Sequence, residues 1–530
     1  MMPAALPSTS ARSIVFAGSS AARHVDGTIA PVQMRTAPML VGRKRHYRLM
    51  SGRNAMNRTV KWGMIAALGL CSTFAALPAG AETCPPVERQ PITRTLMELV
   101  QSDEAVRQDL TASLASARRI NDDPATNPVD SLEAYYDLID ALVTYDPRNI
   151  PTGPQRGAGM HAGMDGANYC NWNILDLISY TYFLVDRQLT TDPRGQIQFQ
   201  NDAFSRWLRG VTESWGAYLE TPASAQYLPE FTGDPNFGDW YCPPEGGYAT
   251  FQDFFTRELC ADTFPNASRP VAGRTDPRTV VAIGDSTPAG TWPISDRGHL
   301  VTSYDGIAQN GMVIKGQLYS SIPEFIAGRP GERVLESFGS IDTDLFHGGT
   351  FTHQFLNVNN YHRLHLPVSG KLVYMRHFQS GVRLKSGWVS PEASPTGDGF
   401  YDPMDTPDWQ FGQTRLVLGI ETERYGTVIA APMGMAQVSA IRLRDWVKEG
   451  AAAEKGWEFA NFAFGGSDFV IIFQDKAGFR LTAATEPAVP PGSGVTYKLI
   501  LQGRKYGCIG GGTDCDGALT EPKPYPGHRR

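Results

Sequence analysis

The feature that most constrains the fold is a change of apolar periodicity near residue 221. Between residues 93 and 219, apolar side chains recur at steps of three and four, as on one face of an amphipathic helix. The clearest example comprises Phe204, Trp207, Leu208, Val211 and Trp215. Beyond residue 222, short alternating apolar runs are broken by Gly, Pro and Asp, which is typical of strands. The sequence therefore predicts an α+β protein, in which a helical N-terminal domain precedes a β-rich catalytic domain.

Individual segments follow from the same patterns. Helices are predicted over residues 131–143 and 174–185, and the second is expected to be buried because it is too short to span a bilayer and contains Asp176. Strands are predicted over residues 370–374, 415–420, 427–431, 468–473 and 495–501. The helical domain is assigned to residues 82–235 and the β-rich domain to residues 236–530.

Composition excludes several classes of protein. Hydrophobic residues make up 42% of the chain and charged residues 19%, which is too apolar for a disordered protein. The 54 glycines and 38 prolines supply the many turns that a β-rich body needs. The formal net charge is −6 without a basic stripe, so a nucleic-acid partner is not expected.

The N-terminal part of the chain has the features of a targeting segment. Residues 1–55 are rich in Arg, Ser and Ala without apolar periodicity, and we expect a disordered or non-native extension, with Met56 as the true start. Residues 56–81 resemble a signal peptide: Arg58 and Lys61 precede an apolar run over residues 62–77, and small residues at 79–81 suit cleavage after Ala81. We therefore expect export, to the periplasm in a Gram-negative cell; a membrane anchor and a buried helix are the alternatives.

Removal of this segment leaves an even number of cysteines. They are Cys84, Cys170, Cys242, Cys260, Cys508 and Cys515. An even number in an exported chain predicts disulfides. Cys508 and Cys515 flank three glycines and are expected to close a small loop, whereas the pairing of the other four is left open. No Cys-x-x-Cys pair occurs, so a zinc ribbon or another metal site is not expected.

Residues 280–286, Val-Val-Ala-Ile-Gly-Asp-Ser, offer a first catalytic hypothesis because they resemble the opening block of GDS-type esterases. A nucleophilic serine needs a base that is oriented by a third group. The nearest Asp-x-x-His, Asp296 to His299, follows Ser286 closely, whereas in that family the pair lies near the C-terminus. The esterase interpretation is therefore disfavoured.

A second family resemblance extends over most of the C-terminal half. Its blocks are Phe-Phe-Thr-Arg-Glu-Leu at 254–259, Arg-Pro-Val at 269–271, Lys-Gly-Gln-Leu-Tyr-Ser at 315–320, Gly-Gly-Thr-Phe at 348–351, Tyr-His-Arg-Leu-His-Leu-Pro-Val-Ser-Gly at 361–370 and Phe-Ala-Phe-Gly-Gly-Ser at 462–467. In this order and spacing they resemble the phosphatidylserine decarboxylases, over roughly residues 245–502.

The resemblance implies a lyase made as a zymogen that cleaves itself between Gly466 and Ser467. Ser467 would attack the carbonyl of Gly466 and become a pyruvoyl group, the cofactor that takes up electrons when CO2 leaves. By position, His365 would be the base for this cleavage and Asp285 would orient it, which makes Ser286 a bystander. The resemblance assigns His362 to decarboxylation or reprotonation of the substrate.

Two further expectations follow from the same resemblance. The two chains produced by cleavage would remain associated. One position departs from the family pattern: the residue after the cleaved serine is usually Thr or Ser, and here it is Asp468. We expect this carboxylate to lie beside the pyruvoyl group, where it would disfavour a negatively charged substrate group.

The substrate is left open among three alternatives. The family default is phosphatidylserine, converted to phosphatidylethanolamine in phospholipid biosynthesis, with contact to a membrane surface. Residues 215–224 resemble the N-terminal extension of the branch with fungal L-tryptophan decarboxylases, which favours a free aromatic amino acid. An inactive binding module is the third alternative, and the presence of Gly466, Ser467 and His365 speaks against it.

Overall fold

The described part of the protein runs from residue 83 to residue 527 of a computed structural model. It omits residues 150–163, 188–195, 234–236, 238–240, 261–267, 305–306, 311, 315–316, 320, 330–331, 357–359, 380–381, 383, 394–398, 405–413, 436–439, 484–485 and 489–496. The extension over residues 1–55, the signal peptide over residues 56–81 and Lys315 of the sequence blocks lie outside the described residues, so those assignments stay predictions.

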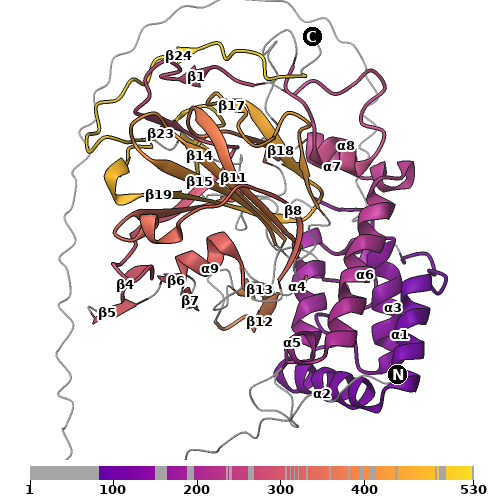
Figure 1. Ribbon diagram of the computed structural model, residues 1–530. Helices are drawn as coiled ribbons and strands as arrows, with labels where there is room; N and C mark the ends of the chain where they lie inside the picture. Colours follow the sequence, from indigo (N-terminus) through magenta and orange to yellow (C-terminus); the bar gives the residue numbers. More distant parts are fainter. Residues whose placement is uncertain are drawn as a thin grey trace, which may run out of the picture. The chain divides into compact units, whose positions relative to one another are not determined.

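Helices dominate the first part of the described chain, as the periodicity predicts. They are α1 (Pro91–Ser102), α2 (Glu104–Ile120), α3 (Leu132–Val143), α4 (Ile174–Val185), α5 (Ile197–Gln200) and α6 (Asp202–Leu219) (Figure 1). The side chains of Asp103, Ser131 and Asn201 accept hydrogen bonds from the first turns of α2, α3 and α6. The predicted helices 131–143 and 174–185 are confirmed, and all of α4 except Leu175 is buried. No helix among the described residues is long and apolar enough to cross a bilayer.

The structure also contains short helices that the sequence patterns did not identify individually. They are α7 (Leu228–Thr232), α8 (Phe251–Phe255) and α9 (Ile322–Ala327), with 3-10 turns at Tyr169–Asn171, Pro222–Ala225, Thr343–Phe346 and Asp475–Ala477. Such short segments show no helical period. Local signals start them instead: a proline in the first turn of α7 and of α9, and the Thr250 side chain that caps α8.

The largest sheet places β19 between two long neighbours. Its order is β17 (Ala452–Ala453), β11 (Gly370–Gln379), β14 (Arg415–Glu421), β15 (Thr427–Met435), β19 (Gly466–Phe473), β9 (Thr350–Leu356) and β3 (Thr287–Pro293), and β8 (Arg333–Phe338) also pairs with β11. These ladders are antiparallel. The predicted strands at 370–374, 415–420, 427–431 and 468–473 are confirmed within β11, β14, β15 and β19.

Smaller antiparallel sheets complete the β-structure. The three-stranded sheets are β10 (Arg363–His365), β18 (Glu458–Phe462) and β16 (Ile441–Leu443), and β2 (Thr279–Val281), β23 (Lys505–Cys508) and β20 (Arg480–Leu481). The two-stranded sheets are β1 (Val271–Ala272) with β24 (Leu519–Thr520), β12 (Lys385–Val389) with β13 (Phe400–Met404), β21 (Glu486–Ala488) with β22 (Tyr497–Leu499), β4 (Val301–Tyr304) with β5 (Ile307–Asn310), and β6 (Met312–Ile314) with β7 (Gln317–Tyr319). The predicted strand 495–501 is shortened to β22, and residues 495 and 496 lie outside the described residues.

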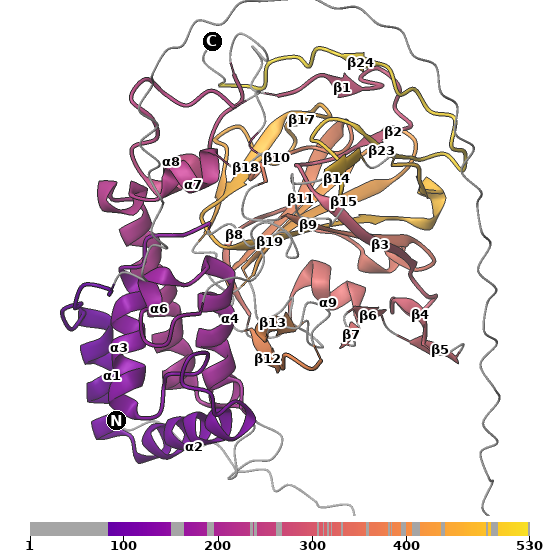
Figure 2. The same cartoon turned by 180° about the vertical axis from the view of Figure 1, so that it is seen from behind.

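Both faces of the largest sheet are packed. Side chains alternate along a strand, so Ser467 and Phe469 share one face of β19. The Phe469 ring lies 6.5 Å from that of Phe459 in β18, which places this face toward the sheet of β10 and β18 (Figure 2). On the other face, Phe351 of β9 lies 6.3 Å from Phe325 of α9. Ser467 is therefore oriented toward the layer that carries His365.

The helices share a continuous apolar core with the sheets. Helix α4 lies against β12 and β13. The Tyr401 hydroxyl of β13 donates to the Thr126 carbonyl and accepts from Asn121, each at 2.9 Å. The described chain is thus a mixed α+β protein, and a helical domain separate at residue 235 stays a prediction.

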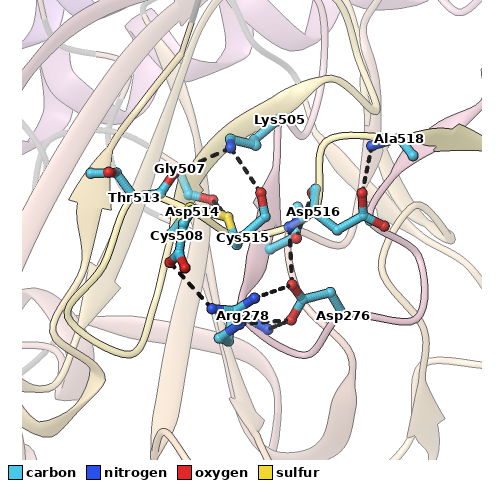
Figure 3. The surroundings of a disulfide bond; sticks show 12 residues. Asp276, Arg278, Lys505, Gly507, Cys508, Thr513, Asp514, Cys515, Asp516 and Ala518 are labelled. Atoms are coloured by element: carbon cyan, nitrogen blue, oxygen red, sulfur yellow. Dashed lines mark hydrogen bonds and ion pairs between the residues drawn. A yellow bond between two sulfur atoms is a disulfide. The ribbon is translucent and has the colours of Figure 1, made fainter.

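The six cysteines form three disulfides. They are Cys84–Cys170, Cys242–Cys260 and Cys508–Cys515. The expected loop between Cys508 and Cys515 is confirmed, and the pairs that the sequence left open are assigned. Around this loop, Arg278 bonds to Asp276 and to Asp514, which ties the loop to the segment before β2 (Figure 3).

Truncation of the inter-sheet contact should destabilise the chain. Phe469→Ala is expected to lower the free energy of unfolding by about 3–5 kcal/mol, because it leaves a cavity between the two sheets. The measurement is chemical denaturation in a Ser467→Ala background, which removes the predicted nucleophile. Leu335→Ala is the control, because Leu335 is 43% exposed and its loss should change stability by less than about 0.5 kcal/mol. Equal losses would contradict this packing.

Candidate active site

Ser467 occupies a fully buried position at the start of β19. It pairs with Gly434 of β15 and with Leu356 of β9, so backbone ladders flank it on both sides. Its hydroxyl donates to the Gly465 carbonyl at 3.3 Å. Gly465 has φ of 150°, which residues with a side chain rarely adopt, so the chain enters β19 through a conformation that favours glycine. The serine of the predicted cleavage pair is thus held in a defined backbone position.

His365 lies in β10 with both ring nitrogens engaged. Nδ1 is 2.8 Å from the Gly456 carbonyl, and Nε2 is 3.1 Å from the Tyr361 hydroxyl. A carbonyl can only accept, so Nδ1 carries the proton and Nε2 accepts from Tyr361. Burial lowers the pKa of His365 to about 4, which leaves the imidazole neutral at pH 7. A neutral imidazole of fixed tautomer is chemically suited to act as a base.

Asp285 contacts a cation, and no hydrogen bond among the described residues joins it to His365, so the predicted orienting role of Asp285 stays a prediction. The Arg269 guanidinium donates to both carboxylate oxygens, at 2.5 and 3.0 Å, and the Tyr241 hydroxyl donates at 2.9 Å. The backbone amide of Gln502 also donates to Asp285, at 2.9 Å. The physical reason is that a buried carboxylate needs a compensating positive charge, and a neutral histidine provides none.

An aromatic pair bridges the gap between Asp285 and His365. The ring of Tyr241 stacks on that of Tyr361, with centroids 6.2 Å apart, and each tyrosine bonds to one of the two predicted site residues. Tyr241 and Arg269 were not among the predicted site residues. Arg269 stands in one of the family blocks, and the need of a buried Asp285 for a cation was the one signal that could have identified it.

His362 has a different environment from His365. It is fully buried, and its ring stacks on Phe255 with centroids 3.8 Å apart. Neither ring nitrogen makes a hydrogen bond of good geometry with a described residue, and the contact with the Asn360 backbone is weak. Burial and the charge of Arg257 lower the pKa of His362 well below its usual value, against the smaller opposing effect of the Asn360 backbone. Two buried, unsatisfied nitrogens are what a ligand-binding histidine presents in the free protein.

An aromatic cluster surrounds the segment that leads to the cleavage pair. Phe464 lies two residues before Gly466. Its ring centroid is 5.1 Å from the ring centroids of Phe251, Phe255 and Trp215. Trp215 belongs to α6, so a helix from the first part of the chain contacts the segment before the cleavage pair. Phe255, which stacks on His362, contacts the same segment. These aromatic rings give the segment before Gly466 apolar surroundings.

The predicted position of the Asp468 side chain is wrong. Alternation along β19 places its side chain on the opposite face from Ser467, and not beside the group expected at that position. Its carboxylate lies 2.8 Å from Nε2 of His353 in β9, and both side chains are buried. The carboxylate is thus already engaged, and its effect on a substrate would be indirect.

The esterase hypothesis gains no support from the geometry. The Ser286 hydroxyl donates to the Gln354 side chain at 2.9 Å and contacts the Gly284 carbonyl at 3.5 Å, so no histidine activates it. Asp296 is exposed, near the isolated bridge between Ile294 and Leu300. Among the residues that the structure describes, no group of three or more His, Cys, Asp or Glu residues could hold a metal ion.

Comparison with known proteins agrees with this arrangement. Residues 251–497 match the phosphatidylserine decarboxylase family. This segment of the chain, a little under half of its length, is therefore similar to that family. The similar proteins are named as decarboxylases, which supports an enzyme of the carboxy-lyase class.

Individual relatives are distant and differ in what they are named for. An L-tryptophan decarboxylase of Psilocybe cyanescens is 23% identical over 325 residues, which covers 56% of this chain and 68% of that protein. The decarboxylase iboD of Amanita muscaria is 27% identical over 309 residues, covering 53% and 79%. Phosphatidylserine decarboxylase proenzyme 2 of Oryza sativa subsp. japonica is 26% identical over 273 residues, covering 51% and 37%. The chain thus spans little more than a third of the rice relative.

Acid should destabilise the chain through His365. Its folded pKa of about 4 lies below the usual 6.5, so between these values the unfolded chain binds a proton that the folded chain excludes. Stability therefore falls as the pH drops from 6.5 to 4, and His365→Gln should reduce that fall by about 3 kcal/mol. Denaturation of the Ser467→Ala chain at several pH values measures it. Leu335→Ala should keep the original pH dependence, and an unchanged slope in His365→Gln would refute the low pKa.

Proposed function

We propose that the chain is a pyruvoyl-dependent decarboxylase that forms its cofactor from Ser467 and converts phosphatidylserine to phosphatidylethanolamine. The observation that carries the proposal is the placement of Ser467, buried at the start of a central strand and oriented toward the layer that contains His365. Similarity to the phosphatidylserine decarboxylase family over residues 251–497 supports the decarboxylase chemistry. The cleavage and the lipid substrate are the parts that need testing.

Cleavage begins with attack of the Ser467 hydroxyl on the Gly466 carbonyl. The peptide bond between the two residues breaks, the acyl group moves to Oγ, and a base passes the hydroxyl proton to the departing nitrogen. Elimination of the Gly466 carboxylate and hydrolysis, which releases ammonia, would then leave the pyruvoyl group at position 467. A serine hydroxyl is a weak nucleophile without such a base. His365 suits the role because it is neutral at pH 7 and Nε2 is its accepting nitrogen. The Ser467 hydroxyl donates to Gly465 in the uncleaved chain, so it must rotate before the transfer.

The pyruvoyl group supplies an electron sink for the charge left when CO2 departs. The residues around Ser467 suit a site that holds this group. His362 is proposed to bind the substrate and to move a proton at its α-carbon, because both ring nitrogens are buried and make no hydrogen bond of good geometry with a described residue. The rings of Phe255 and Phe464 exclude water from the same region.

The two chains would stay together without a covalent link. All three disulfides join cysteines on the same side of the Gly466–Ser467 bond. The parts are instead joined by ladders: β19 pairs with β9 and β15, β23 with β2, and β24 with β1. Lys505 and Cys515, shown in Figure 3, lie on the small-fragment side, and Arg278 lies on the other.

A free aromatic amino acid is the second candidate substrate. The specific observation that favours it is the contact of Trp215 with Phe464, since an aromatic wall near the cleavage segment suits an aromatic side chain. Phosphatidylserine and a free amino acid share the α-amino and α-carboxyl groups on which the chemistry acts. The two candidate substrates differ only in the group attached to the β-carbon.

Self-cleavage is the first consequence to test. Denaturing mass spectrometry of the purified chain should show a fragment that begins at position 467 with a blocked, borohydride-reducible N-terminus. His365→Ala should stop the cleavage, because the serine loses its base. Ser286→Ala is the matched control and should cleave as the parent does. An uncut chain with full decarboxylase activity would refute the proposal.

Cleavage and turnover should separate at His362. His362→Ala is expected to cleave but to lose turnover by ~10²–10⁴-fold, the usual loss when an acid–base group is removed. The measurement is CO2 release from phosphatidylserine in mixed micelles and from L-tryptophan, normalised to cleaved chain. Release from phosphatidylserine alone supports the first substrate, and release from L-tryptophan alone supports the second. Wild-type turnover in His362→Ala would remove this residue from the mechanism.

A further inference from the structure

Tyr241 forms a contact that the reaction described above does not yet use. Its hydroxyl donates to the Asp285 carboxylate at 2.9 Å, and the residue is 5% exposed. Its ring lies between the guanidinium of Arg257, 4.3 Å from the ring centroid, and the ring of Tyr361. Because Tyr361 in turn contacts His365, Tyr241 connects Asp285 to the proposed base through the Tyr361 side chain.

A disulfide holds the backbone that carries Tyr241. Tyr241 pairs with Leu259 in an isolated antiparallel bridge. The next residue on each side, Cys242 and Cys260, form a disulfide with their Cα atoms 4.9 Å apart. Short neighbouring segments with a single backbone bridge have little stability of their own, so the covalent link determines whether they remain adjacent.

One of the two cysteines in this disulfide is exposed to solvent, where a reductant can reach it. Cys242 is exposed and Cys260 is buried. In contrast, Cys508 and Cys515 are both buried, and their surroundings are the ion pairs of Arg278 (Figure 3). Exposed disulfides exchange with thiols more readily than buried ones. The two short-range disulfides of the chain therefore differ in accessibility.

We propose that Tyr241 is a positioning residue for Asp285 and that the Cys242–Cys260 disulfide keeps it in place, so that self-cleavage requires this disulfide to be formed. The inference rests on the proposed function. Formation of the bond oxidises two thiols, and the two electrons and two protons pass to an oxidised thiol compound such as glutathione disulfide. Cleavage would then follow oxidative folding, and the reduced chain would remain an uncut proenzyme.

The test is the rate of cleavage of the full chain made by cell-free synthesis in defined glutathione buffers. In oxidising buffer the parent should cleave, and in reducing buffer it should cleave at least about 10-fold more slowly, as should Cys242→Ser/Cys260→Ser in either buffer. Cys508→Ser/Cys515→Ser is the matched control and should cleave at close to the parent rate in oxidising buffer. Equal slowing of both double variants would overturn the proposal, since it would indicate a general loss of stability.

Tyr241→Phe tests the hydroxyl without disturbing the disulfide or the ring stack. It should slow cleavage roughly 10-fold, because Asp285 loses one hydrogen bond to its charge. Turnover per cleaved chain should not change. Likewise, reductant added after cleavage should leave CO2 release from the substrate identified above intact. A purely structural role would lower cleavage and turnover together.

The outcomes distinguish this inference from the function on which it rests. If the parent cleaves equally fast in both buffers, or if Tyr241→Phe cleaves at the parent rate, the inference fails and the proposed function stands. If no chain cleaves in any buffer, the proposed function fails and this inference falls with it.

Discussion

The double pairing of β19 is the constraint on which the proposed site depends. A cut between Gly466 and Ser467 would make residue 467 a chain end, and chain ends fray unless they are held. Here, ladders to β15 and β9 hold it from its first residue. The residues that follow, from Phe469 to Phe473, are fully buried. After such a cut, the largest sheet would therefore hold residue 467 in position without its bond to Gly466.

Compensation of buried charge organises the interior around this strand. Asp468 has a hydrogen-bond contact with His353 on the opposite face of the sheet, and the carboxylate of Asp285 is paired with the guanidinium of Arg269. Burial alone would lower the pKa of Arg269, and Asp285 outweighs that effect and raises it. Removing one partner of such a pair would leave an uncompensated charge at a cost of about 3–5 kcal/mol. These partners hold the polar side chains near the site in place. Their positions would therefore be kept if the backbone were cleaved.

Sequence periodicity predicts the long elements well because each repeats its pattern over several turns or residues. Helices α3 and α4 and strands β11, β14, β15 and β19 were identified in this way. Helices α7 to α9 were missed because five or six residues carry no period. The period of two along β19 also implied that Asp468 points away from Ser467, and the prediction failed there because it considered only adjacency in sequence.

The contacts of Asp285 depend on tertiary structure and were beyond such patterns. Its partner Tyr241 stands beside Cys242, which forms a disulfide with Cys260, and the sequence left the pairing of these cysteines open. Arg269 could be suspected only from the general need of a buried carboxylate for a cation. The family blocks therefore located the candidate residues, whereas the relation between Asp285 and His365 required the structure.

The two histidines of the block at residues 361–365 differ in a way that suits two different tasks. His365 lies inside β10, where hydrogen bonds to Gly456 and Tyr361 fix its tautomer. A histidine held in this way suits the proposed self-cleavage, which would occur once in each chain and always at Ser467. His362 precedes the strand and stacks on Phe255, and its ring nitrogens make no hydrogen bond of good geometry with any residue that the structure describes. Unsatisfied buried nitrogens destabilise a fold by about 1–3 kcal/mol each. A ligand that bonds to them removes this cost, so the more poorly satisfied histidine is the one suited to bind and release substrate repeatedly.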